Sequence, residues 1–224
     1  IDFSAAESKT ITPLASLHLT GRKGATITGG NFKFAGADCA DFSLENVTVV
    51  AGGQAILIEF DAAGATMNSL KLNNVVLDGF SKSVIYGNAE TNSIDEVSFK
   101  GLTVLNQGTG QGMFDLRKGS YSSLVITEST LTGGRDLIRM DAGVANGVFE
   151  LSKNTLYAIN AGNNSNGVLY VRSASNQVYT VSDNLFLNIT ALLGKNDAAV
   201  RFPTFTNNFY YGMGENVFTG KFDQ

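Results

Sequence analysis

The sequence lacks tryptophan and has only one cysteine, one histidine and two prolines in 224 residues. A lone Cys39 excludes an internal disulfide framework, and Cys39 with His18 cannot compose a zinc site of the usual four-ligand kind. We expect Cys39 to be a small buried hydrophobe. With so little proline, the turns must depend on the 25 glycines and on asparagine, which accept left-handed backbone angles.

Charge is also scarce, since charged residues make up 16% of the chain, the net charge is -4 and the pI is near 5.0. Without a general basic field, we expect no nonspecific binding of nucleic acid or anionic membrane. No run approaches the ~18 apolar residues of a membrane span, and no signal peptide is recognisable. The chain begins with Ile1 rather than Met, so we expect that a leader or an earlier domain was removed.

What the sequence does contain is a ten-residue phrase that recurs. Its copies are FSLENVTVVA (42–51), LKLNNVVLDG (70–79), VSFKGLTVLN (97–106), LVITESTLTG (124–133), FELSKNTLYA (149–158), YTVSDNLFLN (179–188) and YGMGENVFTG (211–220). A spacing of 25 to 32 residues between copies indicates a solenoid, in which each turn stacks on the one before.

Three columns of the aligned copies are apolar and therefore predict inward side chains. They read Phe42, Leu70, Val97, Leu124, Phe149, Tyr179, Tyr211; Leu44, Leu72, Phe99, Ile126, Leu151, Val181, Met213; and Val49, Leu77, Val104, Leu131, Leu156, Phe186, Phe218. The second and third columns are an odd number of residues apart, so the chain must bend between them. The bend position reads Val47, Val75, Leu102, Ser129, Asn154, Asn184, Asn216, and stacked Asn amides there can hydrogen-bond between turns.

A further strand follows each phrase. These strands are FKF (32–34), ILIEF (56–60), MFDLR (113–117), LIRMD (137–141), VLYVR (168–172) and AVRF (199–202), with VIYG (84–87) as the least regular member. The i, i+2 spacing of apolar residues excludes helices. We therefore predict an all-β fold: one parallel β-helix domain over residues 1–224, with seven to eight coils of three short strands in 17–220 and a terminal cap in 1–16.

Three strands per coil, an irregular period near 27 and an Asn-bearing bend resemble the right-handed parallel β-helix of the pectate-lyase-like superfamily. "LSKNTLYAIN" and "VSDNLFLNIT" also resemble secreted β-helix domains of Bacteroidota surface proteins associated with polysaccharide use. The resemblance implies an extracellular or outer cell surface location and an elongated carbohydrate ligand, but it fixes no chemistry. We expect a monomer.

Pectate lyases need a base, commonly Arg or Lys, and often calcium held by carboxylates. Their Arg-x-Pro-x-x-Arg pattern is half present, because RFPTFT (201–206) supplies Arg201 and Pro203 but ends in Thr206. The predicted fold also resembles that of the polygalacturonases. Their hydrolysis reaction needs several aspartates and a histidine around one bond, whereas this chain has no Asp-Asp pair. Hydrolysis therefore ranks below lyase chemistry, and calcium is expected only with a lyase.

The outer face of the third strand carries most of the candidate site residues. Its two columns read Glu59, Asp115, Arg139, Tyr170, Arg201 and Asp61, Arg117, Asp141, Arg172, Pro203. Arginine forks beside an aromatic ring suit the carboxylates, sulfates or ring planes of an acidic polysaccharide. The alternative is that residues of opposite sign on adjacent coils pair across the strands and only stabilise the fold. Tyr157 lies outside the inward columns and offers a second aromatic face for a sugar.

Three hypotheses follow from these residues. The first is a surface module that binds extended polysaccharide along the third-strand face. The second is a polysaccharide lyase with Arg201 as its base. The third is a passive adhesin or spacer, in which the charged columns serve only stability.

Overall fold

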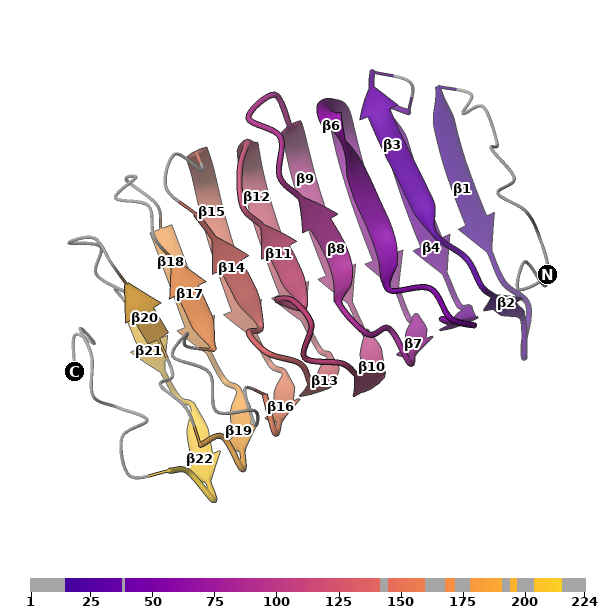
Figure 1. The fold of residues 1–224 in the computed structure, drawn as a ribbon. Helices are drawn as coiled ribbons and strands as arrows, with labels where there is room; N and C mark the ends of the chain where they lie inside the picture. Colours follow the sequence, from indigo (N-terminus) through magenta and orange to yellow (C-terminus); the bar gives the residue numbers. More distant parts are fainter. Residues whose placement is uncertain are drawn as a thin grey trace.

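The computed structural model describes residues 15–37, 39–141, 145–159, 168–171, 178–190, 194–196 and 204–214. In these ranges all of the regular secondary structure is β-strand, and the paired strands run parallel. The chain forms a β-solenoid of about six turns (Figure 1). This is slightly fewer than the seven to eight coils predicted.

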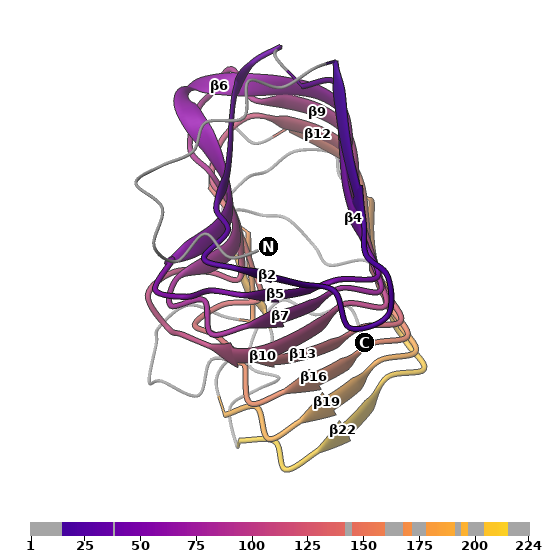
Figure 2. The same ribbon diagram turned by 90° about the vertical axis from the view of Figure 1, so that its right-hand side faces the viewer.

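Three stacks of strands form the sides of the solenoid. Sheet A contains β2 (Thr26–Thr28), β5 (Thr48–Val50), β7 (Val76–Asp78), β10 (Thr103–Gln107), β13 (Thr130–Gly133), β16 (Thr155–Tyr157), β19 (Leu185–Leu187) and β22 (Phe209–Tyr211), stacked in that order (Figure 2). Sheet B contains β1 (Ser16–Thr20), β4 (Asp41–Glu45), the second part of β6 (Ile56–Asn73), β9 (Ser93–Lys100), β12 (Ser120–Thr127), β15 (Ala145–Ser152), β18 (Val178–Ser182) and β21 (Thr204–Thr206).

Sheet C is built from the third strand of each turn. It contains β3 (Phe32–Gly36), the first part of β6, β8 (Ser83–Gly87), β11 (Phe114–Leu116), β14 (Ile138–Met140), β17 (Leu169–Val171) and β20 (Gly194–Asn196). The long β6 joins sheets C and B, since one end pairs with β3 and β8 and the other with β4 and β9. At this corner the prediction of separate short strands was wrong.

The predicted inward columns are confirmed over most of their length. Leu72 is the register partner of Phe99, and Phe99 is the partner of Ile126, so like side chains lie directly over one another. All three are buried, with exposed fractions of 0 to 1%. Across the interior, the Phe99 and Phe114 rings stack with centroids 5.2 Å apart, which joins sheet B to sheet C. Cys39 is buried as expected.

The bend between sheets B and A changes chemistry along the solenoid. Its early positions are buried aliphatic side chains, and its later positions form a chain of hydrogen bonds between turns. The Asn154 amide donates to Oδ1 of Asn184 at 3.1 Å, and the Asn184 amide donates to Oδ1 of Asn208 at 3.0 Å. Each of those oxygens also accepts the backbone N–H of the preceding turn at 3.0 Å. The predicted amide stacking is confirmed for Asn154 and Asn184 and continues to Asn208, which was not predicted, while Asn216 lies outside the described residues.

That shift reflects a wrong register for the last predicted phrase. Val181 pairs with Phe205 and Phe186 pairs with Tyr210, so the last described turn of the phrase runs through 204–212 rather than 211–220. Tyr211, predicted to be inward, is 68% exposed. Because the length of a loop between strands is weakly constrained, an alignment by period can slip where two neighbouring segments both carry aromatics and glycine.

Candidate functional site

The outer face of sheet C brings together the central residues of the predicted strip. Along the stack, the register neighbours are Lys33, Glu59, Tyr86, Asp115, Arg139, Tyr170 and Lys195. Glu59, Asp115, Arg139 and Tyr170 therefore share one column, as predicted, and Tyr86 fills the position that the sequence left uncertain. Arg117 and Asp141 follow in the second column, where the Asp141 N–H donates to the Arg117 carbonyl at 3.2 Å.

The far end of the strip differs from the prediction. Tyr170 pairs with Lys195, so Lys195 holds the position expected for Arg201. β20 pairs with β17 as the next strand of sheet C, and Thr204 already lies in sheet B. The predicted third strand at 199–202 lies outside the described residues. Arg172 and Arg201 both lie outside the described residues.

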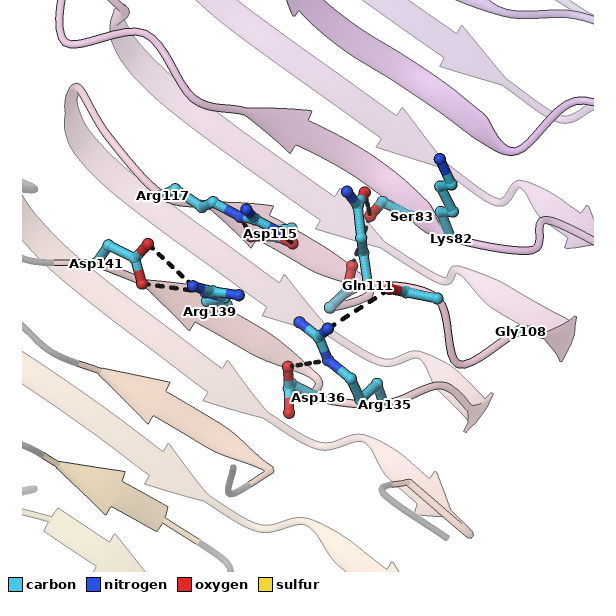
Figure 3. Close-up of polar contacts among 12 residues, drawn as sticks. Lys82, Ser83, Gly108, Gln111, Asp115, Arg117, Arg135, Asp136, Arg139 and Asp141 are labelled. Atoms are coloured by element: carbon cyan, nitrogen blue, oxygen red, sulfur yellow. Dashed lines mark hydrogen bonds and ion pairs between the residues drawn. The ribbon is translucent and has the colours of Figure 1, made fainter. Parts of the chain in front are cut away.

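Two bidentate ion pairs lie along the strands of this face, and Figure 3 shows their side chains. Arg117 donates through Nε and Nη2 to the two carboxylate oxygens of Asp115 at 2.9 and 3.0 Å. Arg139 donates in the same way to Asp141 at 3.0 and 3.1 Å. We call these four residues the arginine–aspartate cluster.

The direction of these pairs was not predicted. The sequence indicated pairing between adjacent coils, such as Asp115 with Arg139, whereas each closest ion pair joins residues i and i+2 of one coil. Residues i and i+2 of a strand lie on the same face about 7 Å apart, which an arginine side chain spans easily. Fork-to-carboxylate geometry then favours two parallel hydrogen bonds with one partner.

Each arginine of the cluster also covers a tyrosine ring of an adjacent coil. The Arg117 Cζ lies 5.4 Å from the centroid of the Tyr86 ring, and the Arg139 Cζ lies 5.7 Å from that of Tyr170. These are cation–π distances. Tyr170 is only 7% exposed, so its ring supports an arginine and is not an open stacking face for a sugar.

Burial makes the two pairs unequal. Asp115 is fully buried, and its side-chain hydrogen bonds raise the pKa of Arg117 above its ordinary value against the opposing effect of burial. The Arg139 and Asp141 side chains keep exposed fractions of 16 and 21%. Arg117 is itself 21% exposed, so the two pairs differ in their aspartates: Asp115 belongs to the framework, whereas Asp141 lies nearer to solvent.

A third arginine lies at the neighbouring corner between sheets A and C. Arg135 donates through Nε to Asp136 at 2.8 Å and through Nη1 to the Gly110 carbonyl at 3.5 Å (Figure 3). The segment GTGQG (108–112), in which Gly110 lies, is the bend between β10 and β11, and its Gly108 N–H donates to the Phe80 carbonyl of the preceding coil at 2.8 Å. Because a strand and not a helix follows it, this glycine-containing segment lacks the strand–loop–helix setting of a phosphate-binding loop.

The acidic end of the strip has the features of an ordinary surface. Asp61 pairs with Lys33 at 3.2 Å. Its pKa is lowered, first by a hydrogen bond from the Ala63 N–H and then by Lys33. Within the described ranges, no three His, Cys, Asp or Glu side chains are grouped so that they could hold a metal ion.

A second face, on the outside of sheet A, was for the most part not predicted from the sequence. Tyr157 is 44% exposed, as its place outside the inward columns predicted. Leu105, Phe209 and Tyr211, with exposed fractions of 38, 62 and 68%, lie on the same sheet. Residues that flank the third apolar column carried the signal, as in TLY and LFL, but apart from Tyr157 they were given no role. FYY was missed because the register of the last phrase was wrong and Tyr211 was predicted to be inward.

Comparison with family models, with curated proteins and with solved structures gave no match in any of the three. The described part of the chain also contains no helix of the length and apolarity that crossing a membrane requires. The β-solenoid fold is therefore shown by the structure alone, and the site must be interpreted from its own geometry.

Proposed function

We propose that this protein is a secreted or cell-surface module that binds extended polysaccharide along the outer face of sheet C. The proposal includes an acidic polysaccharide as the preferred class and the pectate-lyase-like superfamily as the fold family. The observation that carries it is the arginine–aspartate cluster, in which two arginine forks lie on adjacent coils, diagonally across the two columns.

The cluster retains hydrogen-bonding capacity. A guanidinium has five N–H donors, and each bidentate pair uses two of them, so Arg117 and Arg139 each keep three N–H donors for other acceptors. Sugar hydroxyls, carboxylates and sulfates all accept such bonds. The side chains of Arg117 and Arg139 are 21 and 16% exposed, so both can contact a ligand, and Arg139 is the one whose carboxylate partner, Asp141, also reaches solvent.

The cluster is also rigid before any ligand arrives. Each guanidinium is fixed on one edge by a carboxylate and on one face by a tyrosine ring. Little rotamer freedom is then left to lose on binding, which lowers the entropic cost of association. Adjacent coils lie about 4.8 Å apart, so the arginines form the start of a row that a linear polymer can follow.

Affinity gel electrophoresis in polygalacturonate, alginate, chondroitin sulfate and a neutral glucan tests the proposal. We expect retardation in at least one acidic polysaccharide, and at least a five-fold loss of affinity for Arg139→Gln. The matched control is Lys71→Gln, which removes the same charge from an exposed pair with Glu96 on sheet B and should bind as wild type does. Thermal melting of each variant verifies folding.

Two results would overturn the proposal: no retardation in any acidic polysaccharide, or unchanged affinity of a folded Arg139→Gln variant. The first result would favour the hypothesis of a passive adhesin or spacer. Absorbance from unsaturated sugar ends in the same incubations, with and without calcium, separately tests the lyase hypothesis for Arg201.

A further inference from the structure

The outer face of sheet A is the most apolar exposed surface of the described residues. Four of the five large apolar side chains that are most exposed lie on it: Leu105, Tyr157, Phe209 and Tyr211. The fifth, Val148, lies on sheet B. Exposed apolar side chains gathered on one face mark an interaction surface, whereas isolated ones need no explanation.

This face is a pair of columns that run the length of the solenoid. The outward positions are Thr26, Thr48, Val76, Thr103, Thr130, Thr155, Leu185 and Phe209 in one column, and Thr28, Val50, Asp78, Leu105, Thr132, Tyr157, Leu187 and Tyr211 in the other. Threonine predominates at the start, and leucine and aromatic residues predominate at the end. The aromatic end therefore lies over β16, β19 and β22.

Charge is nearly absent from these two columns. Asp78 is their one charged side chain, and its Oδ1 accepts a hydrogen bond from the Asn106 amide at 2.7 Å. The Thr132 hydroxyl is likewise engaged, since it donates to the Val104 carbonyl at 2.7 Å. A ligand of this face must accordingly be held by apolar and ring contacts rather than by ion pairs.

We infer that the outer face of sheet A binds a neutral, linear polysaccharide by stacking the apolar faces of its sugar rings on Tyr157, Tyr211 and Phe209. A β-linked pyranose with equatorial hydroxyls presents C–H bonds on its two faces, and these C–H bonds are attracted to the negative face of an aromatic ring. The inference goes beyond the proposed function, because it uses another sheet, uncharged residues and another class of glycan.

The dimensions of the face favour a polymer chain over a second copy of the protein. Eight strands at about 4.8 Å, each about 10 Å long for three residues, give a strip of about 400 Å². A stable protein–protein interface needs about 800 Å² per partner. A narrow strip whose side chains repeat in every turn matches a ligand that is itself narrow and periodic.

Depletion of the protein by microcrystalline cellulose and by chitin tests this inference. We expect wild type to be depleted by at least one of the two, with retention unchanged at about 1 M NaCl, where ionic contacts are screened within about 3 Å. Tyr157→Ser with Tyr211→Ser should reduce retention at least ten-fold. Tyr157→Ser alone removes one of the proposed sugar-stacking rings and should reduce retention about three-fold.

Two matched variants separate this face from the others. Val148→Ser removes an equally exposed apolar side chain from sheet B and should bind cellulose or chitin as wild type does. Arg139→Gln should also bind cellulose or chitin as wild type does, although its affinity for the acidic polysaccharide falls. Failure of one proposal is therefore distinguishable from failure of the other. Absence of depletion on both solids, or unchanged retention of folded tyrosine variants, would overturn the inference. A wild-type dimer that the tyrosine changes convert to a monomer would also overturn it in favour of a second copy.

Discussion

The outer faces of sheets A and C belong to the same solenoid, yet they differ in which side chains they expose and in whether those side chains are paired. On sheet C, arginine, aspartate and tyrosine satisfy one another, so the charges are largely internal to the fold. On sheet A, uncharged side chains remain exposed at the aromatic end. On sheet C, therefore, only the guanidinium N–H groups left over from the ion pairs are available to a ligand, whereas on sheet A the exposed side chains themselves are available.

The largest expected effect comes from breaking the buried pair on sheet C. Arg117→Ala leaves the Asp115 carboxylate fully buried without its bidentate partner, which should cost about 3–5 kcal/mol of unfolding free energy. Urea unfolding measures the loss. A cost below about 1 kcal/mol would show that the pair is not part of the framework.

Replacing both members of that pair should lower the unfolding free energy less than Arg117→Ala does. Asp115→Leu combined with Arg117→Met removes the carboxylate and the guanidinium together, so no buried charge is left alone. We expect the double variant to recover about 2 kcal/mol relative to Arg117→Ala. A double-mutant cycle measures the coupling, and strictly additive losses would contradict the assignment of the two residues as partners.

A smaller effect is expected from the pair nearer to solvent. Arg139→Ala should cost about 1 kcal/mol, because Asp141 keeps access to water after its partner is lost. The urea midpoints of the Arg117 and Arg139 variants, compared directly, check the ranking. Equal losses would mean that exposure does not distinguish the pairs.

The smallest effects should come from sheet A. Tyr157→Ser replaces a side chain that is 44% exposed and should change the unfolding free energy by no more than about 0.5 kcal/mol. Differential scanning calorimetry, with Val148→Ser as the exposed counterpart on sheet B, tests this. A loss of several kcal/mol would place Tyr157 in the core and remove it from any binding surface.

Residues with one physical role were predictable from the sequence. Leu72, Phe99 and Ile126 must face inward in any stacked arrangement, so their column was found from periodicity alone. The Arg117–Asp115 pairing was not predictable, because positions i+2 and the adjacent coil are both within reach of a guanidinium and only the rotamer decides. The last turn was misplaced because Asn208 and Asn216 carry the same bend signal, and the period is too irregular to choose between them.

The most direct test of polysaccharide binding by two distinct faces is affinity for one acidic and one neutral polysaccharide, each measured at low salt and at about 1 M NaCl. If both faces bind as proposed, binding of the acidic polysaccharide falls at high salt and in Arg139→Gln, whereas binding of the neutral polysaccharide persists in both and is lost in the Tyr157 and Tyr211 double variant. Affinities that are unchanged by all three substitutions, or a wild-type protein that binds neither polysaccharide, would contradict binding by these two faces.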